Sequence, residues 1–162
     1  MSTESTPSLR RASFEDADRL LAWRNDPTAR AQSLSTEEID GATHRTWLAR
    51  RLADEGTRLF IAEADGVASG MVRVDTTGPG LGEISVAVAA EARGAGLGRL
   101  LVEQGARRAA AELALDSIDA VIKPGNAASL ATFRGAGFGD EREELRDGEV
   151  VVVMTWRPPA DA

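Results

Sequence analysis

The chain has no cysteine, no tyrosine and a single histidine, His44, among its 162 residues. The absence of cysteine excludes disulfides, zinc–thiolate sites and a cysteine nucleophile, and we expect no metal. No run approaches the roughly 20 apolar residues that a membrane-spanning helix needs. Residues 1–8 are polar and unlike a signal peptide. These absences together predict a cytoplasmic protein without a membrane partner.

Positive charge is also scarce, because 19 Lys and Arg stand against 26 Asp and Glu, for a formal charge of −7. Such a chain repels nucleic acids and anionic membranes, so neither is expected as the main partner. With 43% hydrophobic and 28% charged residues, the chain has the size and composition of one soluble domain. We place this domain at residues 9–157, between a disordered N-terminal tail at 1–8 and a flexible tail at 158–162.

Hydrophobic spacing and turn signals predict a mixed α+β domain. We expect Pro27 to end the first helix, Ser35 to begin the second, and residues 76–82 to form a mobile loop because they contain three glycines and a proline. The expected strands are 9–12, 58–64, 67–75, 83–88, 117–123, 140–145 and 150–156. The expected helices are 14–24, 35–52, 97–115 and 126–135.

Three glycines follow the strand expected at 83–88, in the segment 93–98, which reads RGAGLG. Glycine lets a backbone approach a ligand closely, and the unpaired N–H groups at a helix start carry partial positive charge. The spacing is neither the dinucleotide fingerprint nor a nucleotide-triphosphate loop, since Arg99 and Leu100 follow Gly98. The turn is therefore either a tight connection or a binding site for a phosphate or pyrophosphate.

A second motif, NAASLATFRGAGF at 126–138, follows the next expected strand. Together with the 93–98 turn and the order of elements, it resembles the GNAT superfamily of N-acetyltransferases over residues 9–156. The resemblance implies the acyl-CoA N-acyltransferase fold, whose mostly antiparallel central sheet is flanked by helices and whose fourth and fifth strands splay apart. It also implies acetyl-CoA as the donor, a primary amine of a small molecule as the acceptor, and direct attack in a ternary complex.

The same resemblance implies how the coenzyme binds. Main-chain groups of Val86 and Val88 would bond the pantetheine arm, and one of their N–H groups would polarise the thioester carbonyl. Asn126 would line the other wall of the splay, a role compatible with capping the helix that follows. The residues implied for the coenzyme are Val86, Val88, Arg93, Gly94, Ala95, Gly96, Leu97, Gly98, Arg99, Asn126, Ser129 and Phe133.

An alkylammonium has a pKa of about 10, so the acceptor must lose a proton before it attacks. Similar enzymes often carry a glutamate on the fourth strand, which makes Glu83 the expected base; the alternative is an exposed strand carboxylate. His44 is the second candidate, although a single helix histidine is commonly a surface or packing residue. At the position of Phe133 such enzymes commonly carry a tyrosine acid. Since a thiol leaves with a pKa of about 8.5, water, Ser129 or Thr132 could serve instead.

Two helices carry the residues expected to contact the acceptor: Trp23, Arg24 and Asn25 in the first, and His44 and Trp47 in the second. This arrangement resembles the acetyltransferases of amino-sugar nucleotides, of the pseudaminic-acid pathway type, and implies contacts with a polar, phosphorylated amine. The alternative is that these side chains cap helices and fill the core. The net negative charge favours instead a cationic acceptor such as an aminoglycoside.

Other functions also fit the sequence. Similar layouts occur in acetyltransferases that modify ribosomal-protein N-termini, aminoglycosides or natural-product amines. The missing tyrosine leaves open a non-catalytic acyl-CoA-binding module. The apolar run at 150–153 suits either a strand buried in a monomer or the edge of a homodimer.

Overall fold

A computed structural model describes residues 6–160; the ends of both predicted tails, 1–5 and 161–162, lie outside the described residues. The strands form one seven-stranded sheet in the order β1-β2-β3-β4-β5-β7-β6. Within it β4 and β5 are parallel neighbours, and the other described pairs are antiparallel. The predicted α+β class with a mostly antiparallel sheet is confirmed.

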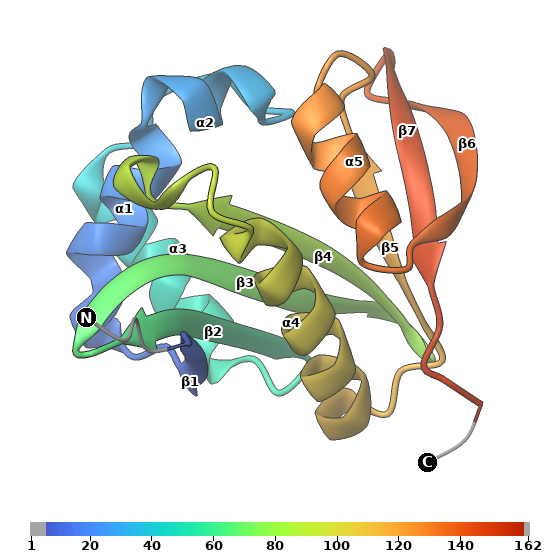
Figure 1. The fold of residues 1–162 in the computed structure, drawn as a ribbon. Coiled ribbons are helices and arrows are strands. Elements are labelled where there is room, and N and C mark those ends of the chain that lie inside the picture. Colours follow the sequence, from blue (N-terminus) through green and yellow to red (C-terminus); the bar gives the residue numbers. More distant parts are fainter. Residues whose placement is uncertain (1–5, 161–162) are drawn as a thin grey trace.

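Helices cover both faces of the sheet (Figure 1). Helices α4 and α5 pack on one face and α1 and α3 on the other. None of the described helices is both long and apolar enough to cross a membrane. The strands are β1 (Ser8–Arg11), β2 (Thr57–Ala64), β3 (Val67–Gly78), β4 (Leu81–Val88), β5 (Ser117–Ile122), β6 (Gly139–Arg146) and β7 (Glu149–Trp156). The helices are α1 (Ala17–Asn25), α2 (Pro27–Gln32), α3 (Gly41–Ala53), α4 (Leu97–Leu113) and α5 (Ala127–Gly135), with 3-10 turns η1 (Phe14–Asp16) and η2 (Ala90–Ala92).

The two faces of β3 belong to two different hydrophobic clusters, as the period of a strand requires. Val72 and Val74 are fully buried under α4, whereas Met71 packs with α1 and α3. Helix α4 approaches β3 closely at Gly105, where an added Cβ would lie 2.6 Å from the Val72 side chain. Glycine at this position therefore sets how near the helix lies to the sheet.

Local signals predicted most element boundaries to within a few residues. The turns at Asp65-Gly66 and Asp147-Gly148 join antiparallel strands, and all four residues have positive φ angles between 50° and 80°, as a two-residue hairpin turn of this kind demands. Asn126 caps α5 as expected, accepting a hydrogen bond from the Ser129 N–H at 3.1 Å.

One of the two helix boundaries predicted near Pro27 and Ser35 is wrong. The first helix ends at Asn25, just before Pro27, as predicted. Pro27 also begins the short helix α2, which was not predicted, because proline suits the first position of a helix and the Asp26 side chain caps it. Helix α3 begins at Gly41 with Asp40 as its cap, not at Ser35. The Ile39 main chain bonds the Asn25 side chain through both its N–H and its carbonyl, which holds this segment outside a helix.

The mobile loop predicted at residues 76–82 is also wrong. Strand β3 continues to Gly78 and β4 begins at Leu81, with a register shift between Thr76 and Gly78. An added Cβ at Gly82 would lie 2.7 Å from the Leu115 side chain. The glycine at 82 is therefore a consequence of tight packing in a strand and not of a flexible loop.

A buried carboxylate joins α1 to the edge of the sheet. The Asp16 side chain is 2% exposed, and Arg10 of β1 donates two hydrogen bonds to it, at 2.9 and 2.8 Å. Arg19 and the Ser13 N–H donate to it as well. The hydrogen bonds from Arg10 lower the pKa of Asp16 below its usual range. This network positions the start of the helix that carries Arg24.

We predict that Asp16→Asn lowers the free energy of unfolding at pH 7 by about 2–3 kcal/mol, since the variant loses hydrogen bonds to a charged group. Because the folded-state pKa lies below the unfolded value of about 3.9, the stabilisation is complete above that value and is lost as the pH falls through the folded-state pKa. Urea titrations at pH 7 and pH 3 would measure both.

The matched control is Asp18→Asn, which removes an exposed carboxylate two residues away and should change the free energy of unfolding by no more than about 0.5 kcal/mol. The stability difference between wild type and Asp16→Asn should shrink in acid. A difference that stays constant down to pH 2 would contradict a role for the ionised carboxylate.

Candidate active site

Strands β4 and β5 pair only over their first residues. Their register runs from Leu81–Ser117 to Ile84–Ala120, although β4 continues to Val88. Figure 1 shows the two strands diverging beyond this point, with α2 on one side of the open end and α5 on the other. The splay that the family resemblance implied is present in this chain.

The register of β3 and β4 decides which main-chain groups face the splay. The Ala89 N–H donates to the Ser69 carbonyl at 2.8 Å, so this residue is bonded toward β3. In an antiparallel ladder, alternate residues direct both main-chain groups to the same neighbour, so Ala87 also bonds toward β3. Val86 and Val88 therefore direct their N–H and carbonyl groups to the side where β5 has turned away.

The turn at 93–98 lies between the end of β4 and the start of α4. Gly94 and Gly96 have φ angles of 85° and 82°, which other residues rarely adopt. An added Cβ at either would meet nothing within 4 Å, so backbone conformation and not crowding requires glycine here. The first N–H groups of α4, which starts at Leu97, have no partner within the helix. The turn thus has the donors and the open space that a phosphate needs.

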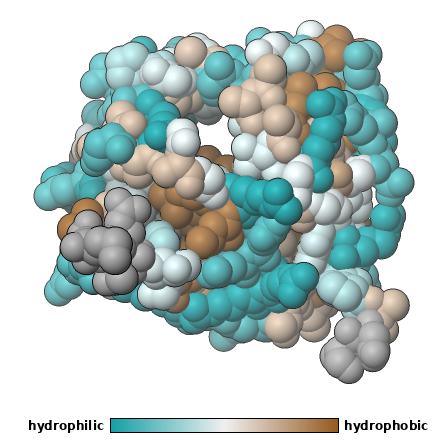
Figure 2. All heavy atoms as spheres, viewed as in Figure 1, coloured by the Kyte–Doolittle hydropathy of each residue, from teal (hydrophilic) through white to brown (hydrophobic). Residues whose placement is uncertain are grey.

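The arginine of this turn and the one that follows it in α4 both have carboxylate partners. Arg93 bonds Asp26, the cap of α2, at 3.0 Å, and the exposed Arg99 bonds Glu103 at 2.7 Å. From the other side, Lys123 at the end of β5 donates to the Ala31 carbonyl at 3.1 Å. Helix α2 is therefore tied to both sides of the splay, and Figure 2 shows an opening in the surface beneath it.

The wall formed by α5 contains no acid at the position expected for it. Phe133 is 4% exposed and packs edge-on against Phe138, with ring centroids 5.1 Å apart. Asn126 donates to the Ser129 hydroxyl at 3.0 Å while it caps the helix. Thr132 lies near the glycine turn, because an added Cβ at Gly98 would be 3.5 Å from its methyl group.

On the opposite face of the sheet, an arginine and a histidine each have a buried nitrogen atom without a hydrogen-bond partner among the described residues. Arg24 donates to the Ser35 carbonyl at 3.0 Å, but its Nη1 atom is buried with no hydrogen bond, and it forms no ion pair with any described residue. His44 is 4% exposed, and its Nδ1 atom is likewise buried without a partner. Burial, Arg24 and Arg45 lower the pKa of His44, so its imidazole is neutral at pH 7.

Trp47 connects these groups to β3. The Arg73 guanidinium lies 5.0 Å from the centroid of its ring, and it also bonds Asp75 at 2.7 Å and the Ser85 hydroxyl at 3.4 Å. Sequence reasoning missed Arg73, although a charge between Val72 and Val74 in a buried strand was a usable signal. Trp47 also lines a hollow of about 460 Å³, together with Thr43, Thr46, Arg50 and Arg51.

The other residues predicted for the acceptor have structural contacts. Both amide atoms of Asn25 bond the Ile39 main chain, at 2.7 and 2.9 Å. Trp23 packs against the cluster of α1, α3 and β2. Of the five predicted residues, the structure brings Arg24, His44 and Trp47 together with Arg73.

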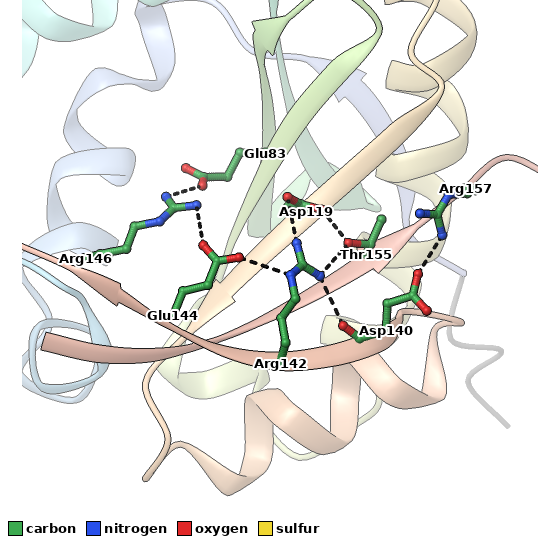
Figure 3. Close-up of polar contacts among 8 residues, drawn as sticks. All are labelled: Glu83, Asp119, Asp140, Arg142, Glu144, Arg146, Thr155 and Arg157. Atoms are coloured by element: carbon green, nitrogen blue, oxygen red, sulfur yellow. Dashed lines mark hydrogen bonds and ion pairs between the residues drawn. The ribbon is translucent and has the colours of Figure 1, made fainter.

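Glu83 lies on this same face of the sheet, near the closed end of the splay. Its neighbours in register are Asp75 on β3 and Asp119 on β5. The Glu83 side chain is 35% exposed and bonds Arg146 of β6 at 2.9 Å (Figure 3). Arg146 was also missed, since nothing in the sequence indicates that the end of β6 reaches β4.

Several solved structures share this architecture. A ribosomal-protein-alanine N-acetyltransferase from Brucella melitensis is 28% identical, with 93% of this chain and 99% of that chain covered and a TM-score of 0.77. AAC(6')-Ib in complex with ribostamycin and coenzyme A is 21% identical, with 94% of each chain covered and a TM-score of 0.82. The putative acetyltransferase yncA from Salmonella typhimurium, with acetyl-CoA, is 20% identical over 98% and 97% of the chains, with a TM-score of 0.77. The likeness to the last two is one of fold.

Among curated proteins, the mycothiol acetyltransferase of Tsukamurella paurometabola is 38% identical over 86 residues. The match covers 51% of this chain but 29% of that protein, so the chain spans less than a third of its length. The family model of the acetyltransferase (GNAT) domain matches residues 8–139. Because this match includes both motifs and the splayed strands, the chain belongs to the GNAT family of acetyltransferase domains.

Proposed function

We propose that the protein moves an acetyl group from acetyl-CoA to a primary amine of a small molecule, an amino sugar or a nucleotide-linked amino sugar. The observation that carries the donor assignment is the unpaired edge of β4, where Val86 and Val88 offer main-chain groups to a pantetheine arm. The 93–98 turn at the open end supplies N–H donors for the coenzyme's pyrophosphate. The β4 edge and then the 93–98 turn follow one another along the splay, as the pantetheine arm and then the pyrophosphate follow one another in the coenzyme.

The acceptor class follows from charge. Arg24 is a partly buried cation without a counter-ion among the described residues. Arg73, which Asp75 neutralises, lies 5.0 Å from the centroid of the Trp47 ring. A buried charge without a partner is costly, so this arrangement favours a ligand that brings an anion. A phosphorylated amine satisfies Arg24, whereas an aminoglycoside would add further positive charge. The local charge therefore outweighs the net charge of −7 as a guide to the acceptor.

The acceptor's ammonium must lose two protons on its way to the amide, one before attack and one as the amide forms, and one proton must reach the thiolate. We assign Glu83 as the base that takes the ammonium proton, after which the nitrogen attacks the thioester carbon. The N–H of Val86 or Val88 stabilises the oxyanion, and the C–S bond then breaks. As the C–S bond breaks, the nitrogen loses its second proton. Water or the Thr132 hydroxyl passes a proton to the coenzyme thiolate, since Phe133 is buried and cannot donate.

Glu83→Gln tests the assignment of the base. Glutamine keeps the size of the side chain and its contact with Arg146 but cannot accept the proton, so we predict that kcat/KM for the acceptor falls at least roughly tenfold. The KM for acetyl-CoA should not change. Release of coenzyme A, followed with a thiol reagent, provides the measurement.

The matched control is Glu141→Gln on β6, which breaks an exposed ion pair with Arg134 of α5 and leaves Glu83 untouched. Its rate should equal that of the wild type. A Glu83→Gln rate within twofold of the wild type would rule out Glu83 as the base and direct attention to His44.

A panel of UDP-glucosamine, glucosamine and tobramycin tests the acceptor class. We predict the highest kcat/KM for UDP-glucosamine, because its phosphates can pair with Arg24. Arg24→Gln should raise the KM for UDP-glucosamine by roughly 10- to 100-fold, the effect of losing a hydrogen bond to a charged group. The KM for acetyl-CoA should not change.

Arg107→Gln serves as the control, since Arg107 is an exposed arginine of α4 on the other face of the sheet. It should leave both KM values unchanged. A wild-type preference for tobramycin would contradict the anionic acceptor and favour an aminoglycoside acetyltransferase. Coenzyme binding without turnover of any amine would identify a non-catalytic acyl-CoA-binding module.

A further inference from the structure

The proposed base has one ion-pair partner, and that partner comes from a distant part of the chain. Arg146 is the last residue of β6, directly before the Asp147-Gly148 turn, and its Nη1 atom lies 2.9 Å from Glu83 Oε1. Its other terminal nitrogen, Nη2, lies 4.0 Å from Glu144 Oε1. Figure 3 shows Arg146 between these two carboxylates. The β6–β7 hairpin therefore supplies a cation to β4.

The positive charge of Arg146 offsets repulsion among carboxylates in the sheet. Asp75, Glu83 and Asp119 lie in register on three adjacent strands, and like charges directly opposite one another are unfavourable. Asp75 has two arginine partners, and Asp119 has one together with the Thr155 hydroxyl at 2.6 Å. Among the described residues, Glu83 has Arg146 alone. Of the three carboxylates, Glu83 is thus the one most easily left without a positive neighbour.

The pair between Glu83 and Arg146 can also be broken easily. Their side chains are 35% and 39% exposed, and an ion pair in water at this exposure contributes only about two- to fivefold to an equilibrium. An acceptor ammonium carries the same charge as Arg146 and can replace it beside Glu83. Glu144, which Arg142 also holds at 3.1 Å, is a second carboxylate within reach of the displaced guanidinium.

We propose that Arg146 is a positioning residue that holds Glu83 in the free enzyme and passes to Glu144 when the acceptor's ammonium takes its place. This inference rests on the proposed function, in which Glu83 is the base. The exchange keeps one cation beside Glu83 until the proton is transferred. The negative charge of Glu83, between Asp75 and Asp119, is therefore neutralised throughout. It also makes the acceptor compete with Arg146, which gives the inference a kinetic signature.

The signature is a pair of opposite changes in acceptor KM. Arg146→Gln removes the competitor, so the KM for UDP-glucosamine, or for the panel amine with the highest kcat/KM, should fall about two- to fivefold. Glu144→Gln removes the alternative partner of Arg146, so the same KM should rise by a similar factor. Arg146→Lys keeps the charge and should restore a KM near that of the wild type. The KM for acetyl-CoA should stay constant throughout.

Arg157→Gln is the control, because it breaks an exposed ion pair with Asp140 at the far end of the same network. Its acceptor KM should equal that of the wild type. A purely structural role for Arg146 predicts that both variants change KM in the same direction or not at all, and either result overturns the exchange. If the exchange is overturned but Glu83→Gln still lowers the rate, the assignment of Glu83 as the base remains valid. No turnover with any panel amine would overturn both proposals.

Discussion

The structure depends on the point at which β4 and β5 stop pairing. Up to Ile84 the two strands satisfy each other's main-chain groups, and beyond it Val86 and Val88 face a gap within an otherwise continuous sheet. Buried peptide groups need partners, so a sheet opened in this way is suited to a ligand that can act as an additional strand edge. A pantetheine arm, with its two amides, is such a ligand. The glycine turn follows β4 and the cap of α5 at Asn126 follows β5, so both come directly after the strands that diverge.

The acceptor side depends on a different principle, the unequal distribution of charge. The chain as a whole is acidic, yet Arg24, Arg73 and the buried His44 converge on one face, and Arg24 has no acidic partner there among the described residues. Close to this face, Glu83 lies in a row of carboxylates that arginines from other elements neutralise. The site thus separates a region suited to an anion from a region suited to an ammonium. An amine that also carries phosphate presents both groups.

Much of the fold could be predicted because its signals are local. The hairpin at Asp65-Gly66 and the cap at Asn126 depend on residues within one turn, and both were correct. The wrong predictions concern features that depend on residues outside the local segment. Pro27 follows the end of the first helix as predicted, but it also begins α2, and the start of α3 depends on a bond between Asn25 and Ile39 that spans a loop. The glycine at 82 does not mark a flexible loop, because a Cβ there would lie only 2.7 Å from the Leu115 side chain.

By itself the sequence determined the family, the succession of helices and strands along the chain, and the glycine turn. Spacing, turn chemistry and positive φ angles all depend on neighbouring residues. It also indicated Glu83, Arg24 and His44 as candidates for the site. Only the tertiary structure decided what those side chains meet. The contact of Glu83 with Arg146 spans 63 residues. The lack of a carboxylate partner for Arg24 among the described residues depends on every element that packs around it. The net charge around a side chain in a folded site depends on residues that are far apart in the sequence. A local sequence pattern therefore cannot predict it.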